Sequence, residues 1–332
     1  MKQENPIRIV TGARLHFGLI DVSPPFGGCG VMLQSPATII QTTSSDRWTE
    51  WGEAHTAAHQ RRLQAIRQRI ACQHDLSPSL PVSLEVVSAS SPHQGLGSGT
   101  QFDLAASEAI LQRLKTDGHF ESGCADNTVL DSEIIQAADR GRRSLVGTHG
   151  YFRGGFIAEG LTTRTDGCLN QIDAQLPLPP SWRVAICLPD RPPGSSGELV
   201  SGDAERSAFQ RLPPVSSQTR DQLIQQVIDE LIPAIKHERY DQFCDAVFQF
   251  NRRSGDLFRD VQGGPYNGDQ ITDVVTRLQA AGWRGVGQSS WGPGVFVWYR
   301  CPDEGDQIED LLSGVAKVVH TQPLNTERRL HD

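Results

Sequence analysis

The residues best suited to chemistry begin with a glycine-rich segment, Ser91–Thr100, which reads Ser-Pro-His-Gln-Gly-Leu-Gly-Ser-Gly-Thr. Glycines that alternate with other residues let a backbone approach a ligand closely. A helix-like stretch begins at Asp103, and amide groups that converge where a helix begins attract an anion. We therefore predict a phosphate-binding loop. The expected phosphate contacts are Gly95, Leu96, Gly97, Ser98, Gly99 and Thr100.

The surroundings of this loop separate it from the two common phosphate loops. Val82–Val87 alternates apolar residues as a half-buried strand does, and Asp103–Lys115 places leucines on one helical stripe. The loop lacks the lysine of a Walker motif. A dinucleotide fingerprint needs an acidic residue after a second strand, and no convincing parallel strand precedes Asp117 or Glu121. The loop therefore belongs to neither class.

A second group of polar residues lies near the start of the chain, where Arg14, His16 and Asp21 fall within eight residues. In a strand, Arg14 and His16 point to the same face, so both could line one cleft. The arginine fork can bond two oxygens of a carboxylate or phosphate at once. The alternative is that His16 is a structural histidine and Asp21 a turn residue before Pro24.

A third group, Arg140–Phe156, contains four arginines, one histidine and five glycines. Glycine weakens a helix by about 1 kcal/mol relative to alanine, so a surface helix rarely combines it with so many arginines. We favour an anion-binding loop over a solvated run of charges. The substrate contacts expected here are Arg142, Arg143 and Arg153, with His149 as a candidate for proton transfer.

Length and composition indicate a soluble globular protein. The 332 residues suffice for one large or two ordinary domains, and 37% are hydrophobic. A net charge of −8 argues against nucleic acid as a partner, so a phosphate site must be locally basic. The seven cysteines show no metal-binding spacing, and no apolar stretch approaches membrane-spanning length. We expect a cytoplasmic protein without nucleic-acid or membrane partners.

Helical and strand-like patterns alternate along the rest of the chain. Strands are expected at 6–12 and 31–42. A helix is expected over His59–His74, with its arginines on a solvated face rather than in a basic patch. Further expectations are a helix at 132–146, a strand-turn-strand at 150–160, a linker at 177–180 and a long loop over 190–214. The remainder predicts helices at 222–236, 239–251, 269–281 and 308–318, with a strand at 295–299.

Three motifs in order resemble those of the GHMP superfamily, which includes galactokinase, homoserine kinase and mevalonate kinase. They are Ala13–Asp21, Pro92–Thr100 and the glycine-rich Gly285–Phe296. The resemblance implies an α+β, two-domain fold with the active site between the domains. Residues 1–176 would form a ribosomal protein S5 domain 2-like N-terminal domain, and 181–325 a ferredoxin-like C-terminal domain. Arg14–Asp21 followed by Gly27–Val31 is most similar to one branch, the β-ribofuranosylaminobenzene 5′-phosphate synthases.

The resemblance also bears on the alternative of an ATP-dependent small-molecule kinase. GHMP kinases have a glutamate that binds Mg²⁺ and an aspartate near the attacking hydroxyl. The matching positions here fall at or beside Arg142 and near Gly150–Phe152, and neither holds a carboxylate. A kinase is therefore the weaker interpretation. A ligand sensor without turnover would keep the same loop and arginines, so only turnover separates it from an enzyme.

The synthase branch implies a particular reaction and set of roles. Its members condense phosphoribosyl pyrophosphate with a para-substituted benzoate, releasing CO₂ and pyrophosphate, on the way to methanopterin-type one-carbon carriers. The resemblance then implies Mg²⁺ held largely by pyrophosphate, Arg14 orienting the benzoate, and a base among His16, His93 and His149. The remaining substrate contacts expected are Asp21, Gln288 and Ser289. The para group, amino or hydroxyl, and a homodimer both stay open.

Overall fold

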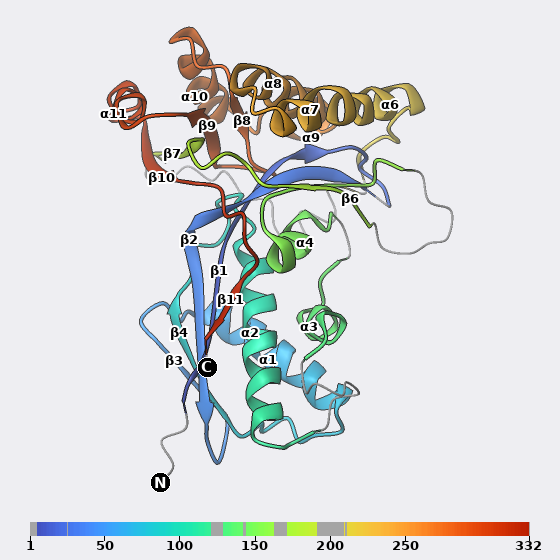
Figure 1. Cartoon of the computed structure of the whole chain (residues 1–332), viewed down its shortest axis with the longest axis vertical. Coiled ribbons are helices and arrows are strands. Elements are labelled where there is room, and N and C mark those ends of the chain that lie inside the picture. The colour runs from blue at the N-terminus through green and yellow to red at the C-terminus, as the bar shows by residue number, and fades with distance from the viewer. Residues whose placement is uncertain are drawn as a thin grey trace.

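The computed structural model describes residues 5–24, 26–120, 129–141, 144–162, 171–190, 209 and 211–331. Within these residues the chain forms two sheets, one of seven strands and one of four, with helices packed against both (Figure 1). The expected α+β architecture is confirmed. No helix in the described part of the chain is long and apolar enough to cross a membrane.

The larger sheet is built around a long antiparallel pair, β1 (Ile7–Leu19) and β2 (Gly28–Ser44). Its strand order is β11-β1-β2-β4-β3, with β4 at Val82–Ser88, β3 at Thr49–Trp51 and β11 at Arg329–His331. Two more strands, β5 (Phe156–Glu159) and β6 (Ile172–Leu176), extend it beside β2. The strand expected at 6–12 continues to Leu19, so most of the first motif lies within β1 rather than beyond it.

Helix α2 (Ser98–Thr116) packs along the larger sheet, with α1 (Ala57–Gln73) and α3 (Asp131–Ala138) beside it (Figure 1). Leu104, Leu111 and Leu114 are buried in one core cluster, as the helical stripe predicts. The helix starts five residues earlier than expected, at Ser98. The second half of the glycine-rich segment is therefore the first turn of a helix.

The expectations for residues 132–160 were wrong in two places. The helix expected at 132–146 ends at Ala138, where Asp139 adopts a left-handed conformation with φ 53°. The strand-turn-strand expected at 150–160 is instead the end of α4 (Val146–Arg153) followed by β5. Gly154 and Gly155, with φ 69° and 71°, separate the two. Backbone turns with positive φ decide both boundaries, and apolar periodicity does not reveal them.

The smaller sheet is antiparallel, in the order β10-β7-β9-β8. Its strands are β7 (Arg183–Pro189), β8 (Val286–Gln288), β9 (Val295–Tyr299) and β10 (Ala316–Thr321). The helices α8 (Tyr240–Asp256), α10 (Asp269–Ala280) and α11 (Pro302–Leu311) gather at this end of the molecule (Figure 1). The helix expected at 308–318 was wrong beyond Leu311, because a turn through Gly314 at φ 70° leads into β10.

The helix expected at 222–236 is a continuous helical run in three parts. These are α6 (Ser217–Gln226), a π-helical turn η1 (Val227–Leu231) and α7 (Ile232–Lys236). Pro233 lies two residues after the end of the π turn, in the first turn of α7. Proline cannot donate the usual backbone bond inside an α-helix. The wider π turn therefore lies beside the position where proline removes an α-helical hydrogen bond.

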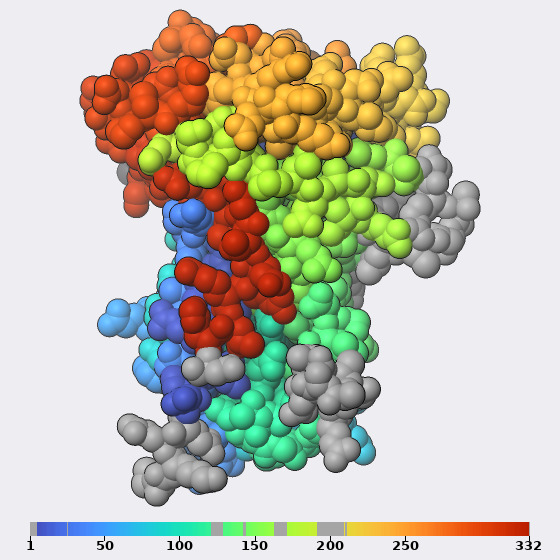
Figure 2. All heavy atoms as spheres, in the orientation of Figure 1, coloured from blue at the N-terminus to red at the C-terminus, as the bar shows by residue number. Residues whose placement is uncertain are grey.

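The end of the chain returns to the larger sheet, where β11 pairs with β1. Figure 2 shows this returning segment as a band of red atoms across the blue and green part of the molecule. The expected linker at 177–180 lies beside it, since Leu178 exchanges two hydrogen bonds with the side chain of Asn325. The strands of the smaller sheet all fall between residues 183 and 321. The expected domain boundaries, 1–176 and 181–325, stay predictions.

Candidate active site

A cavity of about 1220 Å³ opens beside β1 and the start of α2. Ligand pockets usually measure roughly 300–1,000 Å³, so there is room for two small substrates. Its walls come from β1, the glycine-rich segment, α1 and residues 138–148, and on the other side from α8 and the turn between β8 and β9. Residues of all three motifs that the sequence identified therefore line the cavity.

The first turn of α2 forms one end of the cavity. Gly97, with φ 66°, caps the helix, and Ser98, Gly99 and Thr100 line the cavity. The first amide groups of a helix have no partner within the helix and point out of its N-terminus. Gly95 and Leu96 are not among the lining residues, and Leu96 is buried in the core. Only the second half of the predicted loop lines the cavity.

Gly97 and Gly95 hold the loop against neighbouring segments. A Cβ at Gly97 would lie 3.0 Å from Arg14 Nε, and the Arg14 amide donates to the Leu96 carbonyl at 2.9 Å. A Cβ at Gly95 would lie 2.3 Å from the Ser289 carbonyl oxygen. Both glycines also have positive φ. The two positions therefore require glycine because backbone and side chains approach closely.

Five arginines line the same cavity, with two aspartates among the described residues. The arginines are Arg14, Arg61, Arg62, Arg69 and Arg140, and the aspartates are Asp103 and Asp139. This excess of positive charge is local, because the chain as a whole carries −8. Arg61, Arg62 and Arg69 belong to α1, so part of the arginine face expected to be solvated also lines the cavity. A basic wall in an acidic protein suits an anionic ligand.

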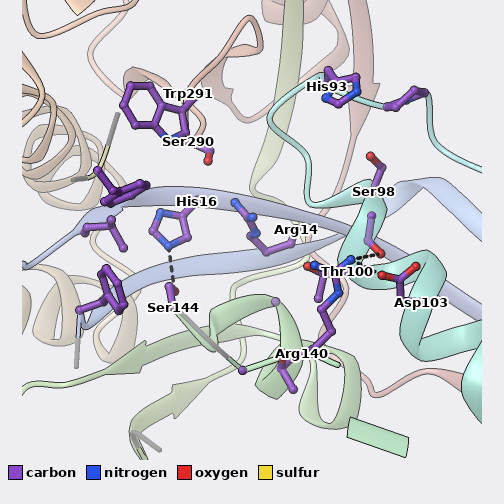
Figure 3. Close-up of a pocket in the computed structure, with 18 of the residues that line it drawn as sticks. Arg14, His16, His93, Ser98, Thr100, Asp103, Arg140, Ser144, Ser290 and Trp291 are labelled. Carbon is purple, nitrogen blue, oxygen red and sulfur yellow. Dashed lines mark hydrogen bonds and ion pairs between the residues drawn. The ribbon is translucent and has the colours of Figure 1, made fainter. Parts of the chain in front are cut away.

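Asp103 joins two of these arginines at the N-terminus of α2. Its carboxylate accepts a hydrogen bond from Arg62 at 2.8 Å and another from Arg140 (Figure 3). Arg140 also donates to the Gly99 carbonyl at 3.2 Å, and a Cβ on Gly99 would lie 2.8 Å from the Arg62 guanidinium. The paired guanidinium groups are thereby held directly beside the helix start, where the helix dipole also favours anions.

His16 lies on β1, two residues after Arg14, and both line the cavity as the strand pattern predicts. Its Nε2 is 3.1 Å from the Ser144 hydroxyl (Figure 3). That hydroxyl donates to Glu159 Oε1 at 2.7 Å, and the Leu145 amide donates to the same oxygen at 2.5 Å. Burial, reinforced by the nearby Arg14 charge, lowers the pKa of His16 well below 6.5. A neutral imidazole therefore faces the cavity.

Sequence reasoning missed Glu159. This carboxylate is fully buried at the end of β5, which pairs with β2 beside Gly28. A Cβ on Gly28 would lie 3.3 Å from the His16 ring, so β2 brings the two groups together. Nothing in the spacing between residues 16 and 159 reveals this contact. A buried glutamate in a short apolar strand was the available signal, because such a residue requires a partner.

Ser289 and Gln288 lie in the third motif, as expected, but their polar atoms bind protein groups. The Ser289 hydroxyl accepts from the His16 amide at 3.0 Å and donates to the Gly95 carbonyl at 2.7 Å. Gln288 lines the cavity, while its side-chain amide bonds Asn267 and Ser290. Ser289 therefore ties β1 to the glycine-rich segment, and its contribution to the site is positional.

The remaining predicted residues fall in different places. His93 is exposed at the cavity wall, with φ 62°. Asp21 does not itself line the described cavity. Its carboxylate accepts a hydrogen bond at 3.0 Å from the amide of Ser23, which does line it, and lies 3.6 Å from Arg220. His149 and the exposed Arg153 belong to α4 and do not appear in the described wall. Arg142 and Arg143 lie outside the residues that the structure describes.

Four aromatic rings form another part of the wall, which sequence reasoning also missed. Phe258 and Trp291 have ring centroids 4.8 Å apart, and Phe209 lies 5.6 and 5.7 Å from them. Phe26 packs edge-on against Phe209 at 5.9 Å. We call these four residues the aromatic wall. They come from distant segments of the chain, so no local pattern predicts that they meet.

The described residues offer no ligand set for a resident metal ion. Across the described ranges, no group of three or more histidine, cysteine, aspartate or glutamate side chains is placed to hold one. Asp103, the carboxylate beside the helix start, is already paired with Arg62 and Arg140.

Comparison with known proteins extends the resemblance along the whole chain. No family model matches. The chain is 25% identical over 307 residues to the beta-ribofuranosylphenol 5'-phosphate synthase of Methanothermobacter thermautotrophicus, covering 87% of each chain. Proteins of the same name from Methanocaldococcus jannaschii and Archaeoglobus fulgidus are 23% and 24% identical. The first of these covers 97% of this chain and 99% of its own.

Solved structures identify the fold. Homoserine kinase from Cytophaga hutchinsonii aligns with a TM-score of 0.67 at 14% identity, covering 100% of this chain and 99% of that structure. Mevalonate-3-kinase from Thermoplasma acidophilum gives 0.63 at 12%, and mevalonate diphosphate decarboxylase from Staphylococcus aureus 0.61 at 14%. Each of those two alignments covers 98% of both chains. The fold is that of the GHMP kinases, and the resemblance to the ribofuranosyl phosphate synthases is confirmed.

Proposed function

We propose that this chain is a decarboxylating phosphoribosyl transferase. It joins phosphoribosyl pyrophosphate to 4-hydroxybenzoate or 4-aminobenzoate and releases CO₂ and pyrophosphate, a step toward methanopterin-type one-carbon carriers. The supporting observation is a single cavity with an arginine-rich end at the start of α2 and an aromatic wall, with Arg14 and His16 between them. The phenol in the relatives' names favours the hydroxyl acceptor.

The bond from ribose C1′ to the pyrophosphate oxygen breaks, and its electron pair leaves with pyrophosphate. The ring carbon that carries the carboxylate uses a π pair to bond C1′, while the para group loses a proton. The bond to the carboxylate then breaks, CO₂ leaves, and its electron pair returns to the ring. The para group regains its proton as aromaticity is restored.

The arginine-rich end suits the leaving pyrophosphate. Negative charge develops there as the C1′ bond breaks, and donors already held in place stabilise it without reorganising. Arg62 and Arg140 are held by Asp103, and the α2 amides are fixed by the helix. Mg²⁺ would enter as part of the substrate, bound to pyrophosphate, where it neutralises phosphate charge. The protein groups position and neutralise the rest.

Arg14 and His16 suit the two ends of the acceptor. Residues two apart in a strand are separated by about 7 Å along the strand. This separation resembles the span of a para-substituted benzoate from carboxylate to para group. Arg14, next to the glycine-rich segment, would meet the carboxylate near C1′, and His16 would meet the para group. Figure 3 shows both residues on β1, between Trp291 and Thr100.

An ATP-dependent kinase is the alternative that the fold suggests. The described wall has no free carboxylate at the helix start, because both Arg62 and Arg140 bind Asp103. The aromatic wall beside a neutral histidine suits an aromatic acceptor. A sensor without turnover would bind the same ligands. Turnover separates the sensor from the transferase, and nucleotide binding separates the kinase.

Isothermal titration and product analysis test the proposal together. In Mg²⁺ buffer, we expect phosphoribosyl pyrophosphate to bind more tightly than ATP. With 4-hydroxybenzoate or 4-aminobenzoate added, mass spectrometry should detect a ribofuranosyl phosphate bonded to the ring through carbon. ATP binding with ADP formation, and no ribosyl product from either benzoate, would favour the kinase. Binding of phosphoribosyl pyrophosphate without any product would favour the sensor.

A further inference from the structure

We propose that Glu159, acting through the Ser144 hydroxyl, fixes His16 as the neutral tautomer with hydrogen on Nε2, so that Nδ1 is the base that faces the acceptor. The inference deepens the proposed function and rests on it for the identity of the proton donor. It assigns Ser144 and Glu159 as positioning residues. The tautomer itself follows from contacts within the protein.

The hydrogen bonds of Ser144 determine which way each proton points. A hydroxyl has one hydrogen to donate and two lone pairs to accept with, whereas an ionised carboxylate can only accept. Ser144 Oγ is 2.7 Å from Glu159 Oε1, so its hydrogen points to Glu159. Its lone pairs then accept from the Val146 amide at 3.3 Å and from His16 Nε2 at 3.1 Å. With Glu159 ionised, Nε2 must therefore carry a hydrogen.

The opposite tautomer would leave these groups in conflict. If Nε2 carried a lone pair, the Ser144 hydrogen would have to point to it. The oxygens of Ser144 and an ionised Glu159 would then face each other at 2.7 Å with no hydrogen between them. Glu159 is fully buried, and a carboxylate away from water depends on its donors. The observed arrangement satisfies all three groups at once.

Nδ1 is left as the basic atom of a neutral ring. No described group hydrogen-bonds to it, and Figure 3 shows it on the side of the ring away from Ser144. His16 lines the cavity, so Nδ1 is open to a ligand there. The charged groups around the ring are Arg14 on its own strand and Glu159 beyond Ser144. Burial and Arg14 both favour the neutral ring.

The proposed step transfers one proton. The para O–H or N–H bond breaks, its hydrogen bonds to Nδ1, and the released electron pair moves toward the ring carbon that attacks C1′. The imidazolium that forms still donates from Nε2 to Ser144, and Glu159 offsets its charge through that hydroxyl. The proton returns to the para group after CO₂ has left. A nucleophile activated by a base that a third group orients is a general arrangement.

Nitrogen-15 NMR of the full chain labelled on histidine tests the tautomer without turnover. The His16 signals among those of the ten histidines are identified by their loss in His16→Gln. At pH 7 we expect a hydrogen-bearing Nε2 and a bare Nδ1. In Ser144→Ala we expect a mixture of tautomers, and in Ser144→Thr, which keeps the hydroxyl, the wild-type pattern. A hydrogen on Nδ1 in the wild type, or an unchanged pattern in Ser144→Ala, would overturn the inference.

Kinetics then test the positioning role. A general base contributes roughly 10²–10⁴-fold, and losing its orientation should lower kcat about 100-fold in Ser144→Ala, with little change in KM for phosphoribosyl pyrophosphate. Ser144→Thr should restore most of kcat, and Glu159→Gln should lie between. If the wild type shows the expected tautomer but no ribosyl product, the proposed function fails and the tautomer assignment stands. If it turns over and Ser144→Ala keeps full kcat, the positioning role fails.

Discussion

His16 is enclosed by protein on one side and open to substrate on the other, and its pKa is lowered by burial and by Arg14. The active form is the neutral ring, so kcat should stay level as pH falls through 6.5 and decline only well below it. We expect this from a pH profile at saturating substrate, with His16→Gln as the control that lacks the acid limb. An acid limb at or above pH 6.5 would assign the base to another group.

The lowered pKa of His16 also makes the free energy of unfolding depend on pH. The unfolded chain binds a proton at His16 near pH 6.5, whereas the folded chain does not until lower pH. Stability therefore falls as pH drops between 6.5 and the folded-state pKa, because the unfolded state binds more protons in that window. The stability that the neutral His16 contributes is fully present above pH 6.5. Urea unfolding of the wild type and His16→Gln should differ in pH dependence in this window alone.

Arg140 lies at the arginine-rich end of the cavity. Its guanidinium is held by Asp103 and by the Gly99 carbonyl beside the helix start. Arg140→Gln should raise KM for phosphoribosyl pyrophosphate roughly 10-fold, the effect of losing about 1.4 kcal/mol of anion binding. Arg277→Gln is the matched control, because Arg277 pairs with Asp273 on the exposed face of α10. Equal KM values for the two variants would show that Arg140 does not contribute to phosphate binding.

At the start of α2, Gly97 combines a positive φ with a close approach to Arg14. A residue with a Cβ at Gly97 would adopt φ 66° and meet Arg14 Nε at 3.0 Å. Gly118 has φ 76° with nothing within 4 Å of an added Cβ. Gly97→Ala and Gly118→Ala should each lose roughly 1–2 kcal/mol of stability from the left-handed conformation. Gly97→Ala alone should weaken binding of phosphoribosyl pyrophosphate, as titration calorimetry would show. Similar affinities of the two variants for phosphoribosyl pyrophosphate would show that the glycine-rich segment does not bind it.

Only the part of the site that lies within single elements could be predicted from the sequence. Ser98–Thr100 and the pair Arg14 and His16 could be identified because their pattern is local, within one loop and one strand. Ser144 is preceded by a helix end that apolar periodicity did not predict, and Glu159 reaches His16 only through the pairing of β2 with β5. The aromatic wall joins residues from 26 to 291. Contacts of this kind are decided by sheet pairing and packing between distant segments.

At the scale of the whole molecule, the end of the chain fastens the larger sheet to α2. Arg328 donates to both carboxylate oxygens of the buried Glu108, which also accepts from the Tyr151 hydroxyl. Arg328→Met would leave Glu108 buried without its cation, which costs about 3 kcal/mol. Urea unfolding should show this loss, and the neighbouring exposed Arg329→Met should show little. A similar stability for both variants would mean that the returning segment does not brace the fold.

The most direct measurement follows the carboxylate of the acceptor. Purified protein, Mg²⁺, phosphoribosyl pyrophosphate and carboxyl-labelled 4-hydroxybenzoate or 4-aminobenzoate are incubated, and labelled CO₂ and pyrophosphate are quantified together. We predict equal amounts of the two products, dependent on both substrates and reduced at least roughly 100-fold in His16→Gln. Folded protein that releases no labelled CO₂ from either benzoate would contradict the proposed transferase.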